Sequence, residues 1–171
     1  MKRCTLLGSL SLLALGPVSA QTPAASAAER ILGTWKLVSY VGEDVASGAR
    51  GDVMGPRPSG YIEYGRDGHM IVIVVGTDRR KPAGPVATPA ESQALLSSLL
   101  AYAGTYTLDT RAQTVTHHIE VSWDQTRTGE SHLRKYRFDG DRLTLTTQPS
   151  RDPATGKTTV RTVVWERVRT P

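Results

Sequence analysis

The sequence predicts an all-β domain, an eight-stranded antiparallel up-and-down barrel with one amphipathic helix. Eight segments rich in aromatic and β-branched residues are separated by short turns, and a single segment has helical periodicity. The length of 171 residues, 39% of them hydrophobic, suits one packed core. Closing consecutive strands into a barrel removes exposed edges, which favours a barrel over the alternative, an open β-sandwich.

The first twenty residues are expected to be a secretory signal peptide. Two basic residues precede a leucine-rich run at 5–15, and the small residues at 18–20 (VSA) form a cleavage site. The run is shorter than the roughly 20 apolar residues that span a membrane. Its removal takes away Cys4, the only cysteine, which excludes a disulfide framework and a cysteine-based zinc site. We therefore expect an exported protein, periplasmic or secreted, whose mature chain has no integral membrane segment.

After the signal peptide, the sequence predicts a short spacer followed by one domain. Residues 21–28 (QTPAASAA) are expected to be a flexible spacer, and residues 29–171 form the barrel domain. The domain is expected to begin with one helical turn at residues 29–32. The strands that follow are predicted at residues 35–41, 60–64, 70–75, 105–108, 115–123, 132–138, 142–147 and 160–168.

Two hairpins set the predicted register of the strands. Gly68 suits a three-residue loop that needs a positive φ angle, which places Tyr64 opposite Met70 and Ile62 opposite Val72. Tyr64, Met70 and Ile62 should line or plug the barrel, and Met70 would suit a pocket that accepts varied shapes. Later in the chain, a two-residue turn at Asp139-Gly140 predicts that Tyr136 opposes Leu143 and Arg134 opposes Leu145.

The predicted helix covers residues 88–103. Thr88-Pro89-Ala90-Glu91 has the pattern of a capping box with proline at the first helical position. The stripe that follows consists of Leu95, Leu96, Leu99 and Leu100. We expect the helix to end at Gly104 and to lie against an apolar surface, flanking the barrel mouth together with a glycine-rich loop at 42–58.

A family resemblance supports the barrel. Gly33-Thr34-Trp35 is similar to the Gly-x-Trp signature that opens the first strand of lipocalins. The series ILGTWKLVSY, GYIEYGRDGHM, AYAGTYTLD, TVTHHIEVS and RKYRFDGDRLTLTT, along residues 31–147, resembles the lipocalin-like domain family of bacteria and fungi. The resemblance implies a calycin barrel open at one end, with Arg167 stacked on Trp35. The late Thr-Asp-Tyr motif of lipocalins has no counterpart, so their receptor-binding face is not carried over.

His117 is the first candidate for the barrel interior. On a strand, adjacent side chains point to opposite faces, so His117 and His118 separate. Because Ile119, Val121 and Trp123 share the face of His117, we place that face inward and His118 outward. A structural interpretation, a core histidine with its hydrogen bonds satisfied, stays open. His69 and His132 lie near turns and are expected at the surface.

Arg134 and Tyr136 share the predicted inward face of the next strand. With His117 they would form one polar wall, in which Arg134 clamps a carboxylate and the other two groups hydrogen-bond a carbonyl or hydroxyl. Alternatively, Arg134 pairs with an internal acid such as Glu63, or lies at the rim with its guanidinium in water. The candidate ligand-binding residues are thus His117, Arg134, Tyr136, Tyr64, Met70 and Ile119.

Three functions remain open. The first is a binding protein for a small apolar or amphipathic molecule, including one that bears a carboxylate. The second is a cofactor-independent isomerase or cyclase acting on a small unsaturated metabolite, with His117, Arg134 and Tyr136 as the polarising groups. The third is a filled barrel that serves as an envelope interaction module. The missing metal-ligand spacing, nucleophile motif and phosphate-binding glycine loop favour binding without a cofactor or metal.

Two further features have structural interpretations. The basic cluster Arg79-Arg80-Lys81 lies between Gly76 and Pro82, so we expect a solvated loop and no nucleic-acid partner. The three tryptophans are expected to pack in the core rather than to stack on a ligand; they are Trp35, Trp123 and Trp165.

Overall fold

The structure, a computed structural model, describes residues 26–152 and 155–169. The signal peptide and its cleavage site fall outside these residues. The helical elements are α1 (Ala27–Ile31), α2 (Pro89–Ser97) and the 3₁₀ helix η1 (Gln125–Arg127). The strands are β1 (Gly33–Asp44), β2 (Arg50–Asp52), β3 (Ser59–Tyr64), β4 (His69–Val75), β5 (Leu99–Asp109), β6 (Thr114–Ser122), β7 (Ser131–Asp139), β8 (Arg142–Thr147), β9 (Ser150–Arg151) and β10 (Thr158–Arg167).

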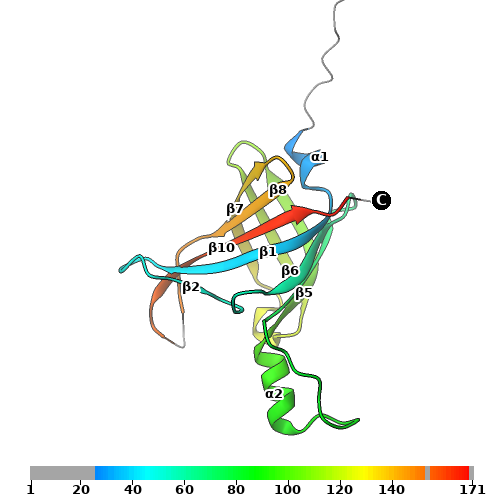
Figure 1. Cartoon of the computed structure of the whole chain (residues 1–171). Helices are drawn as coiled ribbons and strands as arrows, with labels where there is room; N and C mark the ends of the chain where they lie inside the picture. Colours follow the sequence, from blue (N-terminus) through cyan, green and yellow to red (C-terminus); the bar gives the residue numbers. More distant parts are fainter. Residues whose placement is uncertain (1–25, 153–154, 170–171) are drawn as a thin grey trace, which may run out of the picture.

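The strands form the closed eight-stranded antiparallel barrel that the sequence predicts (Figure 1). The strand order is β2-β1-β3-β4-β5-β6-β7-β8-β10-β9, and pairing of β1 with β10 closes the barrel. The short strands β2 and β9 extend two of the hairpins beyond it. In β3 and β4, burial alternates residue by residue, so one face of each strand fills the interior.

The first hairpin has the predicted register. Tyr64 pairs with Met70 and Ile62 with Val72, and all four side chains are buried. Gly68 has a φ angle of 85°, the left-handed conformation that glycine adopts without steric cost. Local turn chemistry and alternation therefore sufficed to place this part of the core.

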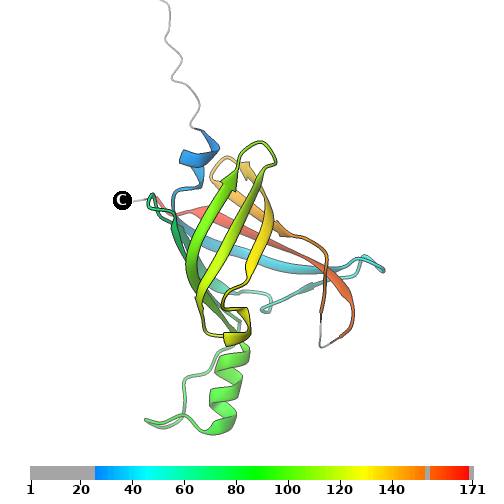
Figure 2. The ribbon, with the colours of Figure 1, turned by 180° about the vertical axis from the view of Figure 1, so that it is seen from behind.

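α1 covers one end of the barrel, which we call the closed end, and α2 lies at the opposite end (Figures 1 and 2). Trp35 is buried beneath α1, and its Nε1–H donates to the carbonyl oxygen of Ile31 at 2.8 Å. The guanidinium carbon of Arg167 lies 4.1 Å from the centre of the Trp35 ring, which confirms the predicted cation–π pair.

The predicted helix is correct at its start and wrong at its end. Thr88 and Glu91 form the capping box, but α2 stops at Ser97, and Leu99 and Leu100 begin β5. They pair with β4 across the sheet, so tertiary pairing overrides the local helical pattern. Gly104 lies inside β5, where a Cβ atom would come within 1.9 Å of the carbonyl oxygen of His118. It marks a close backbone approach rather than a helix end.

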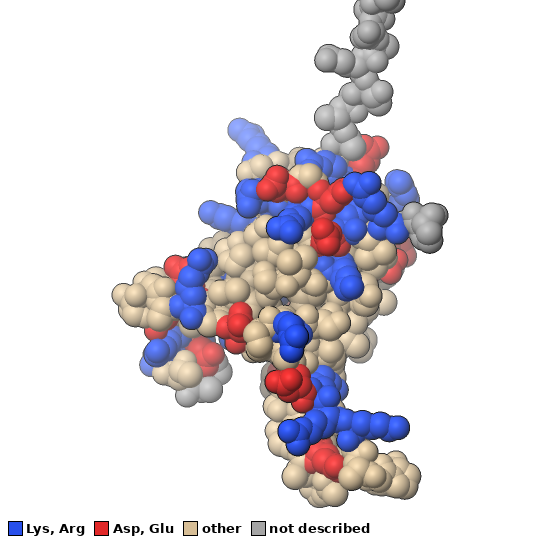
Figure 3. Space-filling view, in the orientation of Figure 1, with Lys and Arg blue, Asp and Glu red and all other residues tan. Residues whose placement is uncertain are grey.

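The expectation that the helix packs on an apolar surface is also wrong. No residue of α2 is buried, and the helix projects away from the barrel (Figures 1 and 2). Arg79, from the basic cluster, holds its C-terminal end: Nη1 donates to the carbonyl oxygens of Leu95 and Ser98 at 2.7 and 3.1 Å. Figure 3 shows charged groups of both signs at the α1 end and along this projecting arm. The cluster lies in an exposed loop, as predicted.

The second hairpin has the predicted faces but a different register. Asp139 pairs with Arg142, so the two-residue turn is Gly140-Asp141 rather than Asp139-Gly140. Tyr136 therefore opposes Leu145, and Arg134 opposes Thr147. The shift is two residues along the partner strand, which preserves the side-chain alternation. Tyr136 and Leu145 remain on the buried face for this reason.

A β-bulge in β6 corrects the prediction for its last residues. Gly104 pairs with Ile119 and Ala103 with Val121, so Glu120 is the extra residue. The bulge reverses the alternation beyond Ile119. Val121 is 67% exposed and Trp123 is 39% exposed, whereas Ile119 and His117 are buried. Trp123 is thus not a core residue, while the other two tryptophans are buried as expected.

Candidate functional site

Two adjoining cavities occupy the end of the barrel opposite α1. The larger, about 510 Å³, is open to solvent and is called the mouth cavity. The smaller, about 30 Å³, lies deeper and is called the floor cavity. Both are lined by Tyr40, Leu100 and Arg134, which mark the passage between them. In volume the mouth cavity suits a small-molecule ligand, and the floor cavity has room only for a water-sized group.

The segments around the mouth differ from those predicted. The mouth cavity is lined by residues of the η1 segment, the start of β7 and the segment from Thr147 to Asp152. No described residue of 42–58 or of α2 lines it. The loop and α2 therefore do not line the mouth cavity, because the β1–β2 hairpin and α2 both extend away from the barrel (Figure 1). Of the predicted helix at 88–103, only Leu100 lines this cavity, and it does so from β5.

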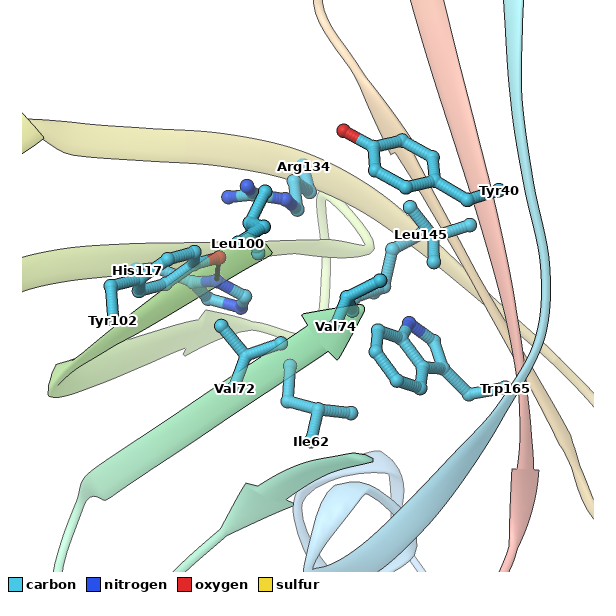
Figure 4. A pocket seen from close by; sticks show the side chains of 11 residues that line it. Tyr40, Ile62, Val72, Val74, Leu100, Tyr102, His117, Arg134, Leu145 and Trp165 are labelled. Atoms are coloured by element: carbon cyan, nitrogen blue, oxygen red, sulfur yellow. Dashed lines mark hydrogen bonds between the residues drawn. The ribbon is translucent and has the colours of Figure 1, made fainter. Parts of the chain in front are cut away.

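The floor cavity has an apolar side and a polar side (Figure 4). The apolar side is formed by inward residues of four strands, namely Ile62, Val72, Val74, Leu145, Val163 and Trp165. The polar side is formed by Tyr102, His117 and Arg134. Since β5, β6 and β7 are consecutive in the sheet, alternation alone brings these three polar side chains to one wall.

His117 is fully buried and hydrogen-bonded through both ring nitrogens. Nε2 lies 2.7 Å from the Tyr64 hydroxyl oxygen, and Nδ1 lies 2.9 Å from that of Tyr102. Burial holds the pKa of His117 well below its usual value, and the charge of Arg134 lowers it further. The ring is therefore neutral at pH 7, and both nitrogens already have partners. His117 positions Tyr102 and is not placed to contact a ligand itself.

Arg134 is the arginine that lines both cavities. It is half-buried on β7, and its Nη1–H donates to the carbonyl oxygen of His132 at 3.1 Å. No acidic side chain among the described residues forms an ion pair with it. Glu63, the internal partner considered from the sequence, is exposed on the outer face of β3, so that pairing is wrong.

The acidic groups of the mouth cavity have partners other than Arg134. Asp124 pairs with Arg127 at 3.5 Å, Glu130 with His132 at 2.7 Å, and Asp152 with Arg161 at 3.4 Å. Hydrogen bonds from Thr126 lower the pKa of Asp124, which keeps that carboxylate charged. His132 was expected at the surface but is half-buried, so that prediction is wrong. Burial lowers its pKa.

Trp165 contributes a buried hydrogen-bond donor to the floor cavity. Its side chain is 2% exposed, and its Nε1–H has no hydrogen-bond partner among the described residues. Figure 4 shows the indole projecting into the cavity from β10, with its nitrogen toward Tyr40 and Leu145. A buried donor without an acceptor costs free energy, and a bound water or ligand oxygen would offset that cost.

The structure brings together two of the six predicted ligand-binding residues. His117 and Arg134 line the floor cavity. Tyr64 reaches the site only through its hydrogen bond to His117. The other three are buried but line neither cavity; they are Tyr136, Met70 and Ile119. The polarising set proposed for an enzyme therefore lacks Tyr136, which lies deeper on β7 against Phe138.

Sequence reasoning missed Tyr102, Tyr40 and Trp165 as lining residues. Tyr102 was assigned to the end of a helix, so its alternation with Leu100 and Gly104 on a strand was hidden. Trp165 was assigned to the core, where it does lie, but its unpartnered Nε1–H gives no sequence signal. Only the register of β10 against β8 shows that it faces the same space as Leu145.

Within residues 26–152 and 155–169, every helix is too short or too polar to span a membrane. No group of three or more metal-ligating side chains lies close enough within the described part of the chain to hold a metal ion.

Comparison with known proteins agrees with the geometry. The sequence model of the lipocalin-like domain matches residues 32–168, which covers the whole barrel from the end of α1 to the residue after β10. A search of curated proteins gave no significant match. The matched range includes the Gly33-Thr34-Trp35 signature and its partner Arg167, which are in contact in the structure. The chain therefore belongs to the lipocalin-like domain family.

Proposed function

We propose that this protein binds a small organic acid in the open end of its barrel, with the carboxylate on Arg134. The family and the barrel fit a small-molecule-binding role. That the ligand is an acid is the more specific part of the proposal, and one observation supports it. Arg134 lies at the passage between the mouth and floor cavities, and it has no acidic partner among the described residues.

The position of Arg134 makes it more effective than a surface arginine. A charge half-buried beside apolar groups interacts more strongly with an anion than the same charge in water. The guanidinium also matches a carboxylate with two parallel hydrogen bonds. An anionic ligand would satisfy a charge that is otherwise costly to keep inside the barrel.

The cavity volumes limit the shape of the ligand. The floor cavity, about 30 Å³, admits only a water-sized group, whereas the mouth cavity of about 510 Å³ admits a small molecule. The carboxylate therefore lies near the passage and the ligand body in the mouth cavity. Apolar contacts there come from Tyr40, Leu100 and Leu133, among charged and polar neighbours. We infer an amphipathic acid rather than a purely apolar one.

Tryptophan fluorescence tests the proposal, because Trp165 lines the floor cavity. The purified protein would be titrated with butyrate, octanoate and benzoate, and with the matching amides as uncharged controls. We expect at least one acid to change the emission saturably and its amide to bind at least tenfold more weakly. Arg134→Leu should abolish the response. Arg137→Leu, on the exposed face of the same strand, is the matched control and should bind as the wild type does.

The outcome against the proposal is equally clear. If none of the acids binds the wild type, or if Arg134→Leu binds them with unchanged affinity, Arg134 is not an anion site. The filled-barrel hypothesis would then gain, since the closed half of the barrel is already filled by Tyr64, Met70 and Tyr136.

A specific observation keeps the enzyme hypothesis as the second candidate. A neutral, buried His117 holds the Tyr102 hydroxyl on the same wall as the Arg134 guanidinium. A hydrogen-bond donor and a cation on one wall would stabilise an enolate oxygen, as an isomerase requires. Tyr102 then takes the place that the sequence assigned to Tyr136. Exchange of the α-proton of a bound ketone with deuterium, lost in Tyr102→Phe, would support this candidate.

Export is also part of the proposal. The apolar run and the VSA sequence at 18–20 support cleavage after Ala20. The mass of the protein recovered from the periplasm or medium should correspond to a chain that begins at Gln21. Recovery of the intact chain from the cytoplasm would contradict export.

A further inference from the structure

We infer that His117 orients the hydroxyl of Tyr102 so that it donates a hydrogen bond into the floor cavity. Tyr102 is then a specificity-determining donor that selects ligands with an oxygen acceptor. The inference rests on the proposed function for the ligand, and on the chain Tyr64–His117–Tyr102 for the direction of the hydrogen bonds.

The hydrogens in this chain of three side chains outnumber its contacts. A neutral histidine has one N–H group and one nitrogen acceptor, and each tyrosine hydroxyl has one hydrogen. Three hydrogens are therefore available for two contacts, Tyr64 with Nε2 and Tyr102 with Nδ1. One hydroxyl hydrogen is left without a partner in the chain. The tautomer of His117 decides which tyrosine keeps it.

Tyr64 is the worse place for the unused hydrogen. Its side chain is 1% exposed, and His117 is its only hydrogen-bond partner among the described residues. It lines neither cavity, and the edge of the Tyr106 ring packs beside it. If Nε2 carried the hydrogen, the Tyr64 hydroxyl would accept it and leave its own hydrogen buried without an acceptor. Such an unmade hydrogen bond is costly.

Tyr102 is the better place, because it lines the floor cavity (Figure 4). When Nδ1 carries the hydrogen, Tyr64 donates to Nε2 and Nδ1–H donates to the Tyr102 oxygen. The Tyr102 hydrogen is then free to meet a water or a ligand oxygen in a space of about 30 Å³. Only in this arrangement does the leftover hydrogen belong to a tyrosine that lines a cavity, where an acceptor can enter, so the structure favours the Nδ1–H tautomer.

The neighbours of Tyr102 have the same preference for an acceptor. The Trp165 Nε1–H is a donor without a partner among the described residues, and Arg134 offers only donors. Three donor groups therefore line a cavity that admits one small group. An oxygen without hydrogens, from a carboxylate or a ketone, accepts hydrogen bonds from such donors, whereas an ammonium group does not. The floor cavity thus selects for the chemical type of the group that enters it.

The tautomer can be measured without a ligand. Long-range ¹H–¹⁵N NMR of the ring-labelled protein distinguishes a protonated nitrogen from an unprotonated one, and His117→Gln identifies the signals of this residue. We expect the nitrogen that bears the hydrogen to be Nδ1. Observation of the hydrogen on Nε2 would overturn the inference, even if acids bind to the protein as proposed.

Binding tests the second half of the inference. Tyr102→Phe should weaken the binding of the acids that change the fluorescence of the wild type, octanoate or benzoate, by about tenfold. Tyr106→Phe is the matched control, since its hydroxyl donates to the Gly65 carbonyl oxygen at 2.9 Å and does not contact His117. Tyr106→Phe should therefore leave the affinity unchanged, and thermal unfolding of both variants would establish that they fold.

The two proposals fail in different ways. If Arg134→Leu abolishes binding but Tyr102→Phe binds like the wild type, the organic acid site stands and the role of Tyr102 is overturned. If no acid binds to the wild type, the proposed function fails and the ligand selectivity of Tyr102 falls with it. If Tyr102→Phe loses about tenfold in affinity and Nδ1 carries the hydrogen, the inference is supported.

Discussion

The guanidinium of Arg167 stacks on the indole of Trp35 and also hydrogen-bonds backbone carbonyl groups at the end of α1. Arg167 Nη1 donates to the carbonyl oxygen of Leu32 at 2.8 Å, and Nη2 donates to that of Arg30. The two residues pair in the register between β1 and β10, the strands that close the barrel. One contact therefore joins the first strand, the last strand and the end of α1. It also seals the closed end, so that access to the interior lies at the other.

Truncation of Trp35 should be severe for this reason. Trp35→Ala removes a buried ring, its hydrogen bond to Ile31 and the surface on which Arg167 stacks. We expect a loss of about 3–5 kcal/mol in the free energy of unfolding, as for other large aromatic truncations in cores. Denaturant unfolding measures it. Trp123→Ala, at a partly exposed position, is the control and should cost far less; equal losses would place Trp35 outside the core.

Gly104 should tolerate no side chain. An added Cβ atom would lie 1.9 Å from the carbonyl oxygen of His118, and the backbone of β6 would have to move. We expect Gly104→Ala to destabilise the protein by about 1–3 kcal/mol or more. Gly51→Ala is the comparison, because nothing lies within 4 Å of a Cβ atom there. Equal melting temperatures for the two variants would mean that the bulge adjusts freely.

This bulge explains much of what the sequence could not predict. Alternation placed His117, Ile119 and Arg134 inside correctly, and it survived a two-residue error in the β7–β8 register. It failed for Val121, because the extra residue Glu120 reverses the faces and has no local signature. The leucines at 99 and 100 satisfy a helical stripe and a strand equally well, so only pairing with β4 decides between them. The site residue Tyr102 was lost through that ambiguity.

The buried His117 should make the protein less stable in mild acid. Its folded pKa lies well below the value of about 6.5 expected for the unfolded chain. Between these two values the unfolded state binds a proton that the folded state does not, so the free energy of unfolding falls as the pH decreases. The slope reaches about 1.4 kcal/mol per pH unit for one histidine. His132, whose pKa is also lowered, adds a contribution of the same sign.

Unfolding measured from pH 7 to pH 5 isolates these histidines. Carboxyl groups with lowered pKa values, such as Asp44 and Asp124, lose their stabilising contribution mainly below this range. His117→Gln should reduce the slope. An unchanged slope in His117→Gln would mean that the folded state takes up the proton at its usual pH.

Arg134 should contribute to ligand binding without stabilising the ligand-free protein. It has no acidic partner among the described residues, and its charge opposes protonation of His117. Replacing an internal ion with an apolar group of similar size is often neutral or stabilising, whereas breaking a buried ion pair costs about 3–5 kcal/mol. We therefore expect the free energy of unfolding of Arg134→Leu to lie within about 1 kcal/mol of the wild-type value, or to exceed it.

Denaturant unfolding of Arg134→Leu and Arg137→Leu without ligand provides this measurement. The same variant gives a second readout, because removal of the charge should raise the pKa of His117 while burial still keeps it low. The fall in stability between pH 7 and pH 5 should then be no larger than in the wild type. A loss of 3 kcal/mol or more, in the range of about 3–5 kcal/mol for a broken ion pair, would contradict this. Such a loss would mean that Arg134 stabilises the barrel. The hypothesis that this arginine serves ligand binding alone would then be excluded.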